Sequence, residues 1–191
     1  MKEIIKKISG IIFRDYSAYY VYSWAAGDPS TSCAVTAYRV DKVDAAQIKA
    51  SPEPLIREQF DDAGTGAHAF ACYHNGKIVS ICFYWFGERY LRERNFLPIA
   101  DGEAKLVQIV TLPDERAKGI AAHLIAASSR EMAKLGFNPL YARIWHSNKA
   151  SWRAFERAGW KRREIIIDIT LFGRGKPFRV RFKSRSLRAG Q

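Results

Sequence analysis

Helical and strand-like patterns of apolar residues alternate along most of this chain. The clearest helical pattern covers residues 119–135, where apolar or small residues recur every three or four positions and so share one face of a helix. The apolar run at residues 106–110, which is typical of a buried strand, precedes it, and Pro113 and Asp114 break the pattern between them. This part of the chain therefore predicts a strand, a short loop and a helix in succession.

Further elements follow from the same periodicities. The Asn75-Gly76 turn signal between two apolar runs predicts a hairpin over residues 68–86. A helix over residues 45–60 should break near Ser51-Pro52, because proline lacks an amide donor. The other expected elements are strands over residues 34–40, 105–110, 140–144, 161–172 and 178–182, and a helix over residues 148–158. The charged segment 88–102 is longer than a usual connection, which makes it a candidate for ligand binding or a homodimer contact.

The first 33 residues give the least regular pattern. Five isoleucines between residues 4 and 12 lie on one helical face with lysines opposite, and residues 16–24 form an aromatic stretch that is either strand or loop. An amphipathic basic helix can dock on its own domain or a second subunit, or it can lie on an anionic membrane. Docking is favoured, and peripheral membrane contact stays the alternative.

Composition narrows the range of partners. The chain has 191 residues, 48% of them hydrophobic, which suits one folded domain. Its 31 Lys and Arg against 19 Asp and Glu give a formal charge of +12, which indicates an anionic partner. Seven basic residues and no acidic residue lie within residues 171–191. A nucleotide, an anionic small molecule, RNA or an acidic membrane surface would each be attracted.

The three cysteines, Cys33, Cys72 and Cys82, indicate neither a disulfide framework nor a zinc site, because their number is odd and their spacing fits no ligand motif. A two-residue turn in the hairpin would place Cys72 opposite Val79 and Cys82 opposite Ala69, and hence the two thiols on opposite faces of the sheet. Reduced, buried cysteines and the short N-terminal apolar run favour a cytoplasmic protein.

The most informative segment is Arg116-Ala117-Lys118-Gly119-Ile120-Ala121, which opens the helix at residue 119. The first turn of a helix has backbone N–H groups without intrahelical partners, and the helix dipole adds positive potential there. Main-chain groups can therefore hold a phosphate without help from side chains. A Cβ at Gly119 would keep a pyrophosphate away, and Ala121 keeps the next inward position small.

This Arg-x-x-Gly-x-Ala pattern resembles the acetyl-CoA signature of the GNAT superfamily of N-acetyltransferases. Residues 148–160 resemble its second signature, an Asn-initiated helix that ends in an aromatic, an acidic and a basic residue and then Gly-aromatic. The resemblance covers about residues 34–182 and implies a single α/β domain with a mixed, mostly antiparallel central sheet flanked by helices. It divides the chain into an N-terminal extension at 1–33, an acetyltransferase domain at 34–182 and a basic tail at 183–191.

The family's two parallel central strands splay apart and admit the pantetheine arm of acetyl-CoA, which would be the co-substrate here. By resemblance, main-chain groups of residues 116–121 would bind the pyrophosphate, and the strand before them would line the thioester. Asn148 would contact the arm or serve only as a helix cap, and Ser151 would reach the arm or remain a surface hydroxyl. The implied binding residues are Ile109, Val110, Arg116, Ala117, Lys118, Gly119, Ile120, Ala121, Asn148 and Ser151.

The catalytic groups are less evident. Glu103, just before the strand that leads into the loop, is the first candidate for a general base, and Asp101 and His146 follow it. Glu103 also has a structural alternative as an exposed strand-end carboxylate, and a lone histidine such as His146 is more often structural. Many family members carry a tyrosine whose phenol protonates the leaving thiolate, but Phe155 stands at that place here. Another tyrosine, water or departure of the free thiolate must replace it.

The sequence thus predicts a cytoplasmic N-acetyltransferase that moves the acetyl group of acetyl-CoA to a primary amine by direct attack in a ternary complex, without a metal. The basic residues between 143 and 163 favour a small, anionic acceptor. One alternative is a nucleic-acid-binding protein that uses the basic residues at 174–188, although no RNA-binding signature accompanies them. Another is a GNAT-fold protein that binds acyl-CoA without turnover.

Overall fold

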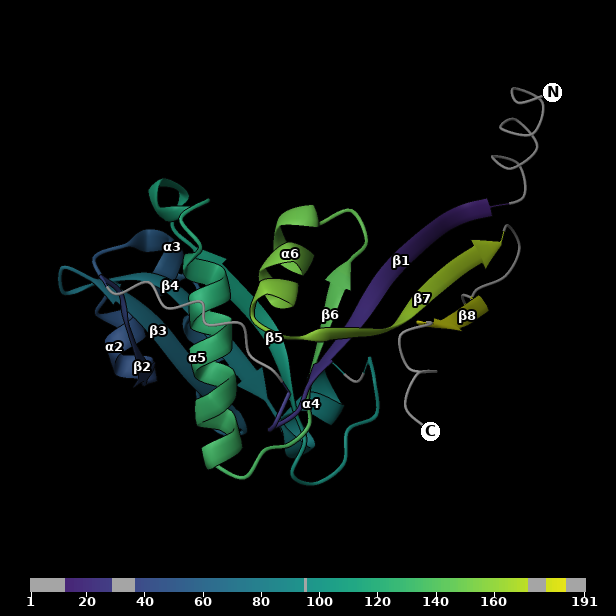
Figure 1. The fold of residues 1–191 in the computed structure, drawn as a ribbon, viewed down its shortest axis with the longest axis horizontal. Helices are drawn as coiled ribbons and strands as arrows, with labels where there is room; N and C mark the ends of the chain where they lie inside the picture. The colour runs from purple at the N-terminus through teal and green to yellow at the C-terminus, as the bar shows by residue number, and fades with distance from the viewer. Residues whose placement is uncertain (1–12, 29–36, 95, 172–177, 185–191) are drawn as a thin grey trace.

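One open sheet of eight strands forms the centre of the protein (Figure 1). The computed structural model describes residues 13–28, 37–94, 96–171 and 178–184. Its strands are β1 (Phe13–Trp24), β2 (Arg39–Val43), β3 (Ala67–His74), β4 (Lys77–Trp85), β5 (Ala104–Thr111), β6 (Leu140–Trp145), β7 (Lys161–Leu171) and β8 (Phe178–Lys183). They lie in the order β2-β3-β4-β5-β6-β1-β7-β8, and β5 and β6 are the parallel pair among antiparallel neighbours. The predicted mixed, mostly antiparallel α/β architecture is confirmed.

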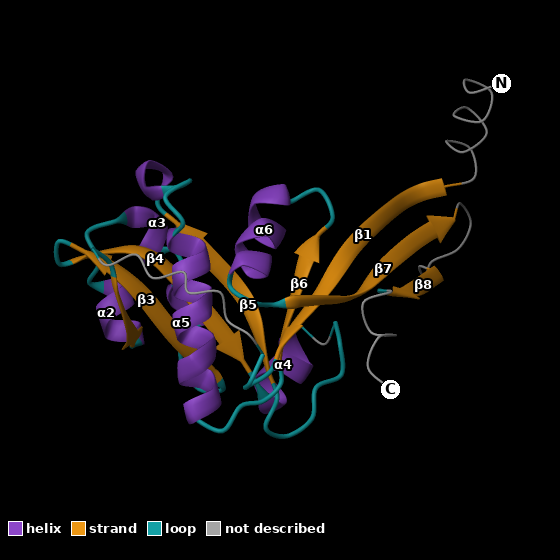
Figure 2. Ribbon diagram, in the orientation of Figure 1, coloured by secondary structure: helices purple, strands orange, loops and turns teal. Residues whose placement is uncertain are grey.

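Helices cover both faces of this sheet (Figure 2). On one face, α5 (Ile120–Lys134) crosses β2 to β5 and lies beside α6 (Lys149–Arg157). The other face packs against α2 (Ala45–Lys49), α3 (Pro54–Arg57) and α4 (Gly87–Glu93). Two short 3₁₀ turns are Phe60–Asp62 and Pro113–Glu115. Within the described ranges no helix combines the length and the apolar character needed to span a bilayer.

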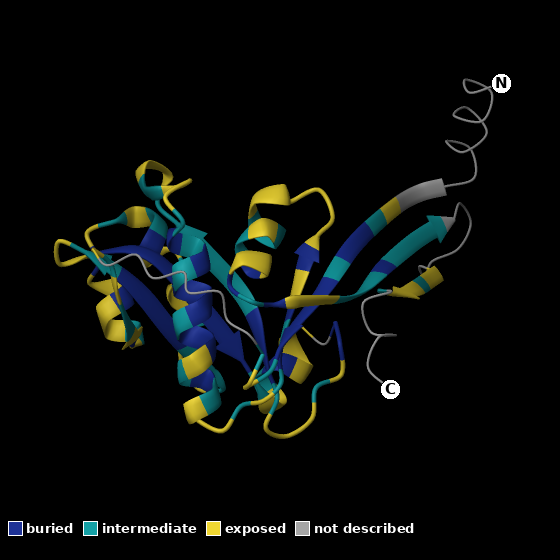
Figure 3. Cartoon of the chain, viewed as in Figure 1, coloured by how far each residue is buried: buried dark blue, intermediate teal, exposed yellow. Residues whose placement is uncertain are grey.

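β4 shows why the core has two halves. Cys82 and Tyr84 belong to the apolar cluster that includes α5, whereas Ile81 and Phe83 belong to the cluster that includes α2 and α3. Successive side chains of a strand point to opposite faces, so β4 is buried on both sides. Figure 3 shows this buried centre in dark blue.

Most predicted elements are confirmed. The expected helix at residues 45–60 is divided into α2 and α3 around Ser51 and Pro52, and the hairpin, the 119–135 helix and the 148–158 helix are found as β3–β4, α5 and α6. The strand expected at 34–40 coincides with β2 only at Arg39 and Val40, and residues 34–36 lie outside the described residues.

The N-terminal division of the chain needs correction. The aromatic stretch is a strand, β1, which lies between β6 and β7, and its Tyr22 and Trp24 are buried. The sheet therefore begins before residue 34, where the start of the domain was expected. Because β1 packs on both sides, its sequence lacks the alternation that marks a one-sided strand. The helix expected at residues 4–12 and most of the basic tail lie outside the described residues.

The predicted placement of the hairpin cysteines is wrong. Cys72 pairs with Ser80 and Cys82 with Phe70, because the register shifts after Cys72. A one-residue bulge moves a side chain to the other face of the sheet, so both thiols face the α5 side. Both cysteines are free and buried, and burial raises the pKa of each thiol to about 12.

Ser129 of α5 connects three parts of the core. Its hydroxyl accepts a hydrogen bond from Trp160 Nε1 at 3.1 Å, lies 3.3 Å from Tyr84 Oη and donates to Ile125 O at 2.7 Å. We expect Ser129→Ala to lower the free energy of unfolding by about 1–3 kcal/mol, because it leaves the buried indole N–H without a partner. Urea unfolding measures the change. Arg130→Ala, at the exposed neighbouring position, is the control and should change it by less than about 0.5 kcal/mol.

Candidate functional site

β5 and β6 separate in the middle of the sheet. They pair only from Ala104 to Leu106 on β5 and from Leu140 to Ala142 on β6. On the β4 side, Leu106 pairs with Tyr84 and Gln108 with Phe83. Val107 lies between them without a partner in β4 and forms a bulge. A bulge bends its strand and increases its twist. Beyond Leu106, backbone groups of β5 that point toward β6 have no ladder partner there.

A cavity of about 690 Å³, here called the loop cavity, opens where the strands part. It lies between the end of β5, the loop to α5, the start of α5 and one side of α6. Of the residues implied by resemblance, those that line it are Ile109, Val110, Arg116, Ala117, Gly119, Ile120, Ala121, Asn148 and Ser151. The structure therefore brings the two sequence signatures together around one space.

The start of α5 faces the loop cavity without a side-chain cap. Gly119 is the N-cap residue with φ +82°, and Ala117 also has a positive φ of 63°. The N–H groups of the first helical turn thus lack intrahelical partners, and the N-cap residue supplies no side chain to them. A Cβ on Gly119 would lie 3.9 Å from Arg157 Nη2, in the space between α5 and α6. The arrangement fits a phosphate or pyrophosphate group.

Cationic side chains surround this helix start. Arg116, Arg153 and Arg157 line the loop cavity, the last two from consecutive turns of α6. Lys118 is not among the lining residues, and its ammonium lies 3.1 Å from the carboxylate of Glu115, which does line the loop cavity. The positive potential at the loop cavity thus comes from three arginines and the main chain, while the Glu115 carboxylate that also lines it is paired with Lys118.

Asn148 and Ser151 lie where the loop cavity meets a second one, since both residues line both cavities. Asn148 Oδ1 accepts a hydrogen bond from Ser151 N at 3.0 Å, which caps α6. Its amide nitrogen stays available as a donor. The cap and the contact role expected for Asn148 are therefore compatible, because they use different atoms of one side chain.

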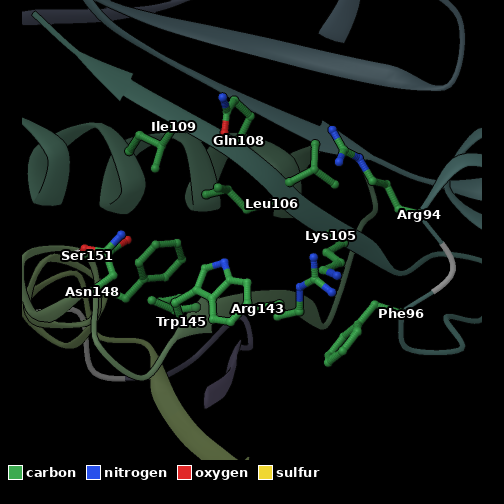
Figure 4. A pocket seen from close by; sticks show the side chains of 13 residues that line it. Arg94, Phe96, Lys105, Leu106, Gln108, Ile109, Arg143, Trp145, Asn148 and Ser151 are labelled. Atoms are coloured by element: carbon green, nitrogen blue, oxygen red, sulfur yellow. Dashed lines mark hydrogen bonds between the residues drawn. The ribbon is translucent and has the colours of Figure 1, made fainter. Parts of the chain in front are cut away.

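The second cavity, here called the gap cavity, has a volume of about 240 Å³ and lies between β5 and β6 (Figure 4). Ile109, Asn148 and Ser151 stand at one end of it, and Arg94, Phe96, Lys105 and Arg143 gather at the other. Arg94 and Phe96 come from the long segment after α4, which the sequence singled out as a candidate for binding. Lys105 is not among the site residues predicted from the sequence.

Lys105 is the only buried charged residue in the described part of the chain, with 4% of its surface exposed. Its Nζ donates a hydrogen bond to Tyr90 Oη at 3.2 Å, and Tyr90 in turn accepts one from Leu97 N at 3.0 Å. Burial, together with the positive charges of Arg143 and Arg94, lowers the pKa of Lys105 to about 7. A lysine within the apolar run at 104–110 was the sequence signal for this site.

The predicted general bases do not reach either cavity. Glu103 accepts hydrogen bonds from Ala100 N at 2.8 Å and Tyr141 Oη at 3.3 Å, at the outer start of β5. His146 Nδ1 lies 3.2 Å from Ala18 O beyond the end of β6, and Asp101 is exposed in a turn. None of the three lines the gap cavity or the loop cavity, so the geometry does not support them as bases.

Phe155 is buried in α6 with its ring 5.0 Å from that of Trp160, and it also lines the gap cavity. Among the described residues no tyrosine lines either cavity. Ser151 therefore carries the hydroxyl that both cavities share. The structure offers no phenol at the place where the resemblance implies an acid.

Comparison with known proteins agrees with this geometry. The sequence profile described as "Acetyltransferase (GNAT) family" matches residues 20–160. A search among curated proteins finds no match to the chain.

Solved structures share the fold at low sequence identity. An acetyltransferase of the GNAT family from Colwellia psychrerythraea has a TM-score of 0.56 at 14% identity, covering 88% of this chain and 61% of its own. A GCN5-related N-acetyltransferase from Sphaerobacter thermophilus has a TM-score of 0.55 at 11% identity, covering 90% and 56%. An aminoglycoside N-acetyltransferase in complex with CoA has a TM-score of 0.50 at 18% identity, covering 64% and 91%. The chain thus spans about three-fifths of the first two proteins.

The buried ammonium of Lys105 should cost stability. Its pKa is about 7 in the folded chain against a usual 10.5, so the unfolded chain binds more protons between these pH values and stability rises with pH there. One pKa unit is worth about 1.4 kcal/mol, which sets an upper limit of about 5 kcal/mol. We expect Lys105→Met to raise the free energy of unfolding by about 1–3 kcal/mol at pH 7, because lost contacts offset part of the gain.

Urea unfolding at several pH values checks this expectation. The gain should be full below pH 7 and should shrink as pH rises from there through 10.5, above which the lysine is neutral in both states. Lys134→Met, at an exposed position of α5, serves as the control. A destabilised Lys105→Met variant with no dependence on pH would contradict the assignment of a charge burial cost to Lys105.

Proposed function

This chain belongs to the acetyltransferase (GNAT) family, and on that premise we propose that it transfers the acetyl group of acetyl-CoA to a primary amine. The amine attacks directly, in a ternary complex. The observation that carries the proposal is the meeting of two cavities at Ile109, Asn148 and Ser151, in the gap between β5 and β6. One cavity suits the nucleotide thioester and the other leaves room for the amine.

The loop cavity would hold the diphosphate of acetyl-CoA. The unpartnered amides at the start of α5 supply directional donors, and Arg116, Arg153 and Arg157 supply charge for the phosphates. The pantetheine arm would then run toward Asn148 and along the open edge of β5. A likeness to an aminoglycoside acetyltransferase solved with CoA supports this assignment at the level of the fold.

Main-chain groups of β5 would supply the catalytic electrostatics. Near Ile109 and Val110, a backbone N–H that faces the gap can donate to the thioester carbonyl oxygen and stabilise the negative charge that develops there as the amine attacks. Such a donor is fixed by the β4 ladder before the substrate arrives, since Ile109 pairs with Cys82 and Val110 with Ile81.

Proton transfer would rely on solvent. Among the described residues, neither a carboxylate nor an imidazole lines the gap cavity, so the ammonium of the acceptor would lose its proton to water before attack. The leaving thiol has a pKa of about 8.5, so its thiolate can depart without a positioned acid. The Ser151 hydroxyl would lie closest to it as a hydrogen-bond donor.

Two competing functions lead to different measurements. A GNAT-fold protein that only binds acyl-CoA would bind CoA but release no free thiol when amines are added. Phe155, at the place of the family's usual tyrosine, is the observation in favour of this alternative. A nucleic-acid-binding protein would need free cations near the C-terminus. Yet Arg179 pairs with Asp168 at 2.7 Å, and Arg181 lies 3.9 Å from Glu164. We therefore favour acetyl transfer.

The proposal is tested by screening an amine library with acetyl-CoA and detecting free thiol. Amine-dependent thiol release, with the acetylated amine identified by mass spectrometry, is the expected result. Tight CoA binding without thiol release for any amine would favour the non-catalytic alternative. Absence of CoA binding would overturn the proposal.

The anion cradle is tested by Gly119→Glu. We expect it to weaken CoA binding by about 100-fold or more, because the carboxylate would occupy the phosphate position and repel the phosphates. Calorimetric titration measures the affinity, and thermal unfolding checks that the variant folds.

The matched control is Gly136→Glu at the other end of α5. Gly136 also has a positive φ, of 93°, and a Cβ there would meet no atom within 4 Å. The two variants therefore share the backbone strain and the added charge but differ in position. Equal CoA affinity in both variants would show that the phosphates bind elsewhere.

A further inference from the structure

We infer that the molecule entering the gap cavity carries an anionic group, a carboxylate or a phosphate monoester, which binds between Lys105, Arg143 and Arg94. This inference rests on the proposed function, since it names the chemical class of the acceptor amine. The amine would lie at the end of the cavity near Ile109, and its anionic group would lie at the opposite end (Figure 4).

The charges at this end of the cavity are not balanced. Arg179, whose guanidinium lies 4.9 Å from the Phe96 ring, forms two hydrogen bonds with Asp168 at 2.7 and 3.0 Å. Arg94 forms a long ion pair of 3.8 Å with Asp62. In the described part of the chain, no carboxylate forms an ion pair with Lys105 or Arg143. One anion in the cavity would neutralise this excess.

Aromatic rings hold the two unpaired cations in place. The Arg143 guanidinium lies 4.3 Å from the Phe96 ring centre and 4.7 Å from that of Tyr19. The Lys105 ammonium lies 5.0 Å from the Phe96 ring and 5.1 Å from that of Tyr90. Ring faces compensate a cation only in part. Burial and the positive charges of Arg143 and Arg94 still lower the pKa of Lys105. The site is therefore oriented before a ligand arrives, and its charge still lacks a partner.

The distance between the two ends sets the shape of the acceptor. Lys105 and Ile109 are four residues apart on β5, which corresponds to about 13 Å of extended strand at most. Side chains at both ends shorten the distance that the acceptor must span. An amine and an anion separated by several bonds would fit, whereas an amine directly beside its anion would not reach both ends.

Lys105 has one competing role, that of a general base. The groups that face it are Tyr90 from α4, Arg94 after α4 and Arg143 from β6. Arg179 from β8 lies 4.9 Å from the Phe96 ring. Anion binding needs the protonated lysine, so preference for an anionic amine should fall as pH rises through about 7. A base needs the neutral lysine, and it would accelerate anionic and neutral amines alike.

The test compares matched acceptors with the full chain and acetyl-CoA. The acceptors are unbranched amines of increasing chain length that end in a carboxylate, in a phosphate or in an uncharged carboxamide. We expect kcat/KM for the better anionic series to exceed that for the carboxamides by about 10- to 100-fold at pH 6.5. The series with the larger advantage identifies the anion as carboxylate or phosphate.

Lys105→Met should bring the ratio of kcat/KM for anionic amines to kcat/KM for carboxamides close to one and remove the dependence of this ratio on pH. Arg92→Met is the matched control, because it removes the same charge from an exposed position of α4 that lines neither cavity. The control should retain the ratio of the parent protein. A ratio near one in the parent, or a Lys105→Met variant that slows both series equally, would overturn the inference while leaving acetyl transfer intact.

A binding arm separates this inference from the proposed function. Calorimetry with CoA-loaded protein measures binding of the same amines without turnover. Binding that depends on the anion and is lost in Lys105→Met supports the anion site even where no amine is acetylated, a result that would reject only the transfer reaction. Equal binding of carboxamides and anions would overturn the anion site.

Discussion

The extra residue in β5 is the constraint on which the rest of the site depends. Val107 has no partner in β4, and pairing between β5 and β6 ends at the residue before it. A regular strand would continue beside β6 and close the sheet, because the parallel ladder would satisfy the facing N–H and C=O groups. The bulge instead turns the second half of β5 away, and β4 alone continues to hold it. Those open backbone groups and the two cavities arise from this one irregularity.

The two cavities differ in how they obtain their positive potential. In the loop cavity much of it comes from the main chain, through the uncapped start of α5 and the left-handed conformation at Gly119. In the gap cavity it comes from side chains of three separate elements, with Lys105 buried among rings. Main-chain donors cannot titrate, whereas a lysine with a pKa near 7 can. Binding in the gap cavity should therefore depend on pH much more strongly than binding in the loop cavity.

The parts of the site that could be predicted from the sequence are those encoded locally. The strand, loop and helix around Gly119 and the capped helix at Asn148 each lie within a short stretch, so residue type and spacing were sufficient. Glu103 was a reasonable base by its position before β5, but Tyr141 and the turn at Ala100 hold its carboxylate outside the cavities. Lys105 stands out in the sequence as a lysine within an apolar run, but its role could not be inferred, because its burial depends on the segment after α4 folding over β5. The bulge after Cys72 likewise changed which face a thiol occupies, and no residue type signals such a shift.

The same fold occurs in solved structures at identities of 11–18%. A phosphate site made of peptide N–H groups requires only a small residue and a helix start, so most side chains around it can vary. The opposite end of the gap cavity depends on Arg94 and Phe96, which come from the long connection between α4 and β5. Connections tolerate substitution and insertion better than strands do. Under the proposed function, the choice of acceptor would thus be carried by the segment that is freest to change, while the strand it covers would keep the reacting groups in register.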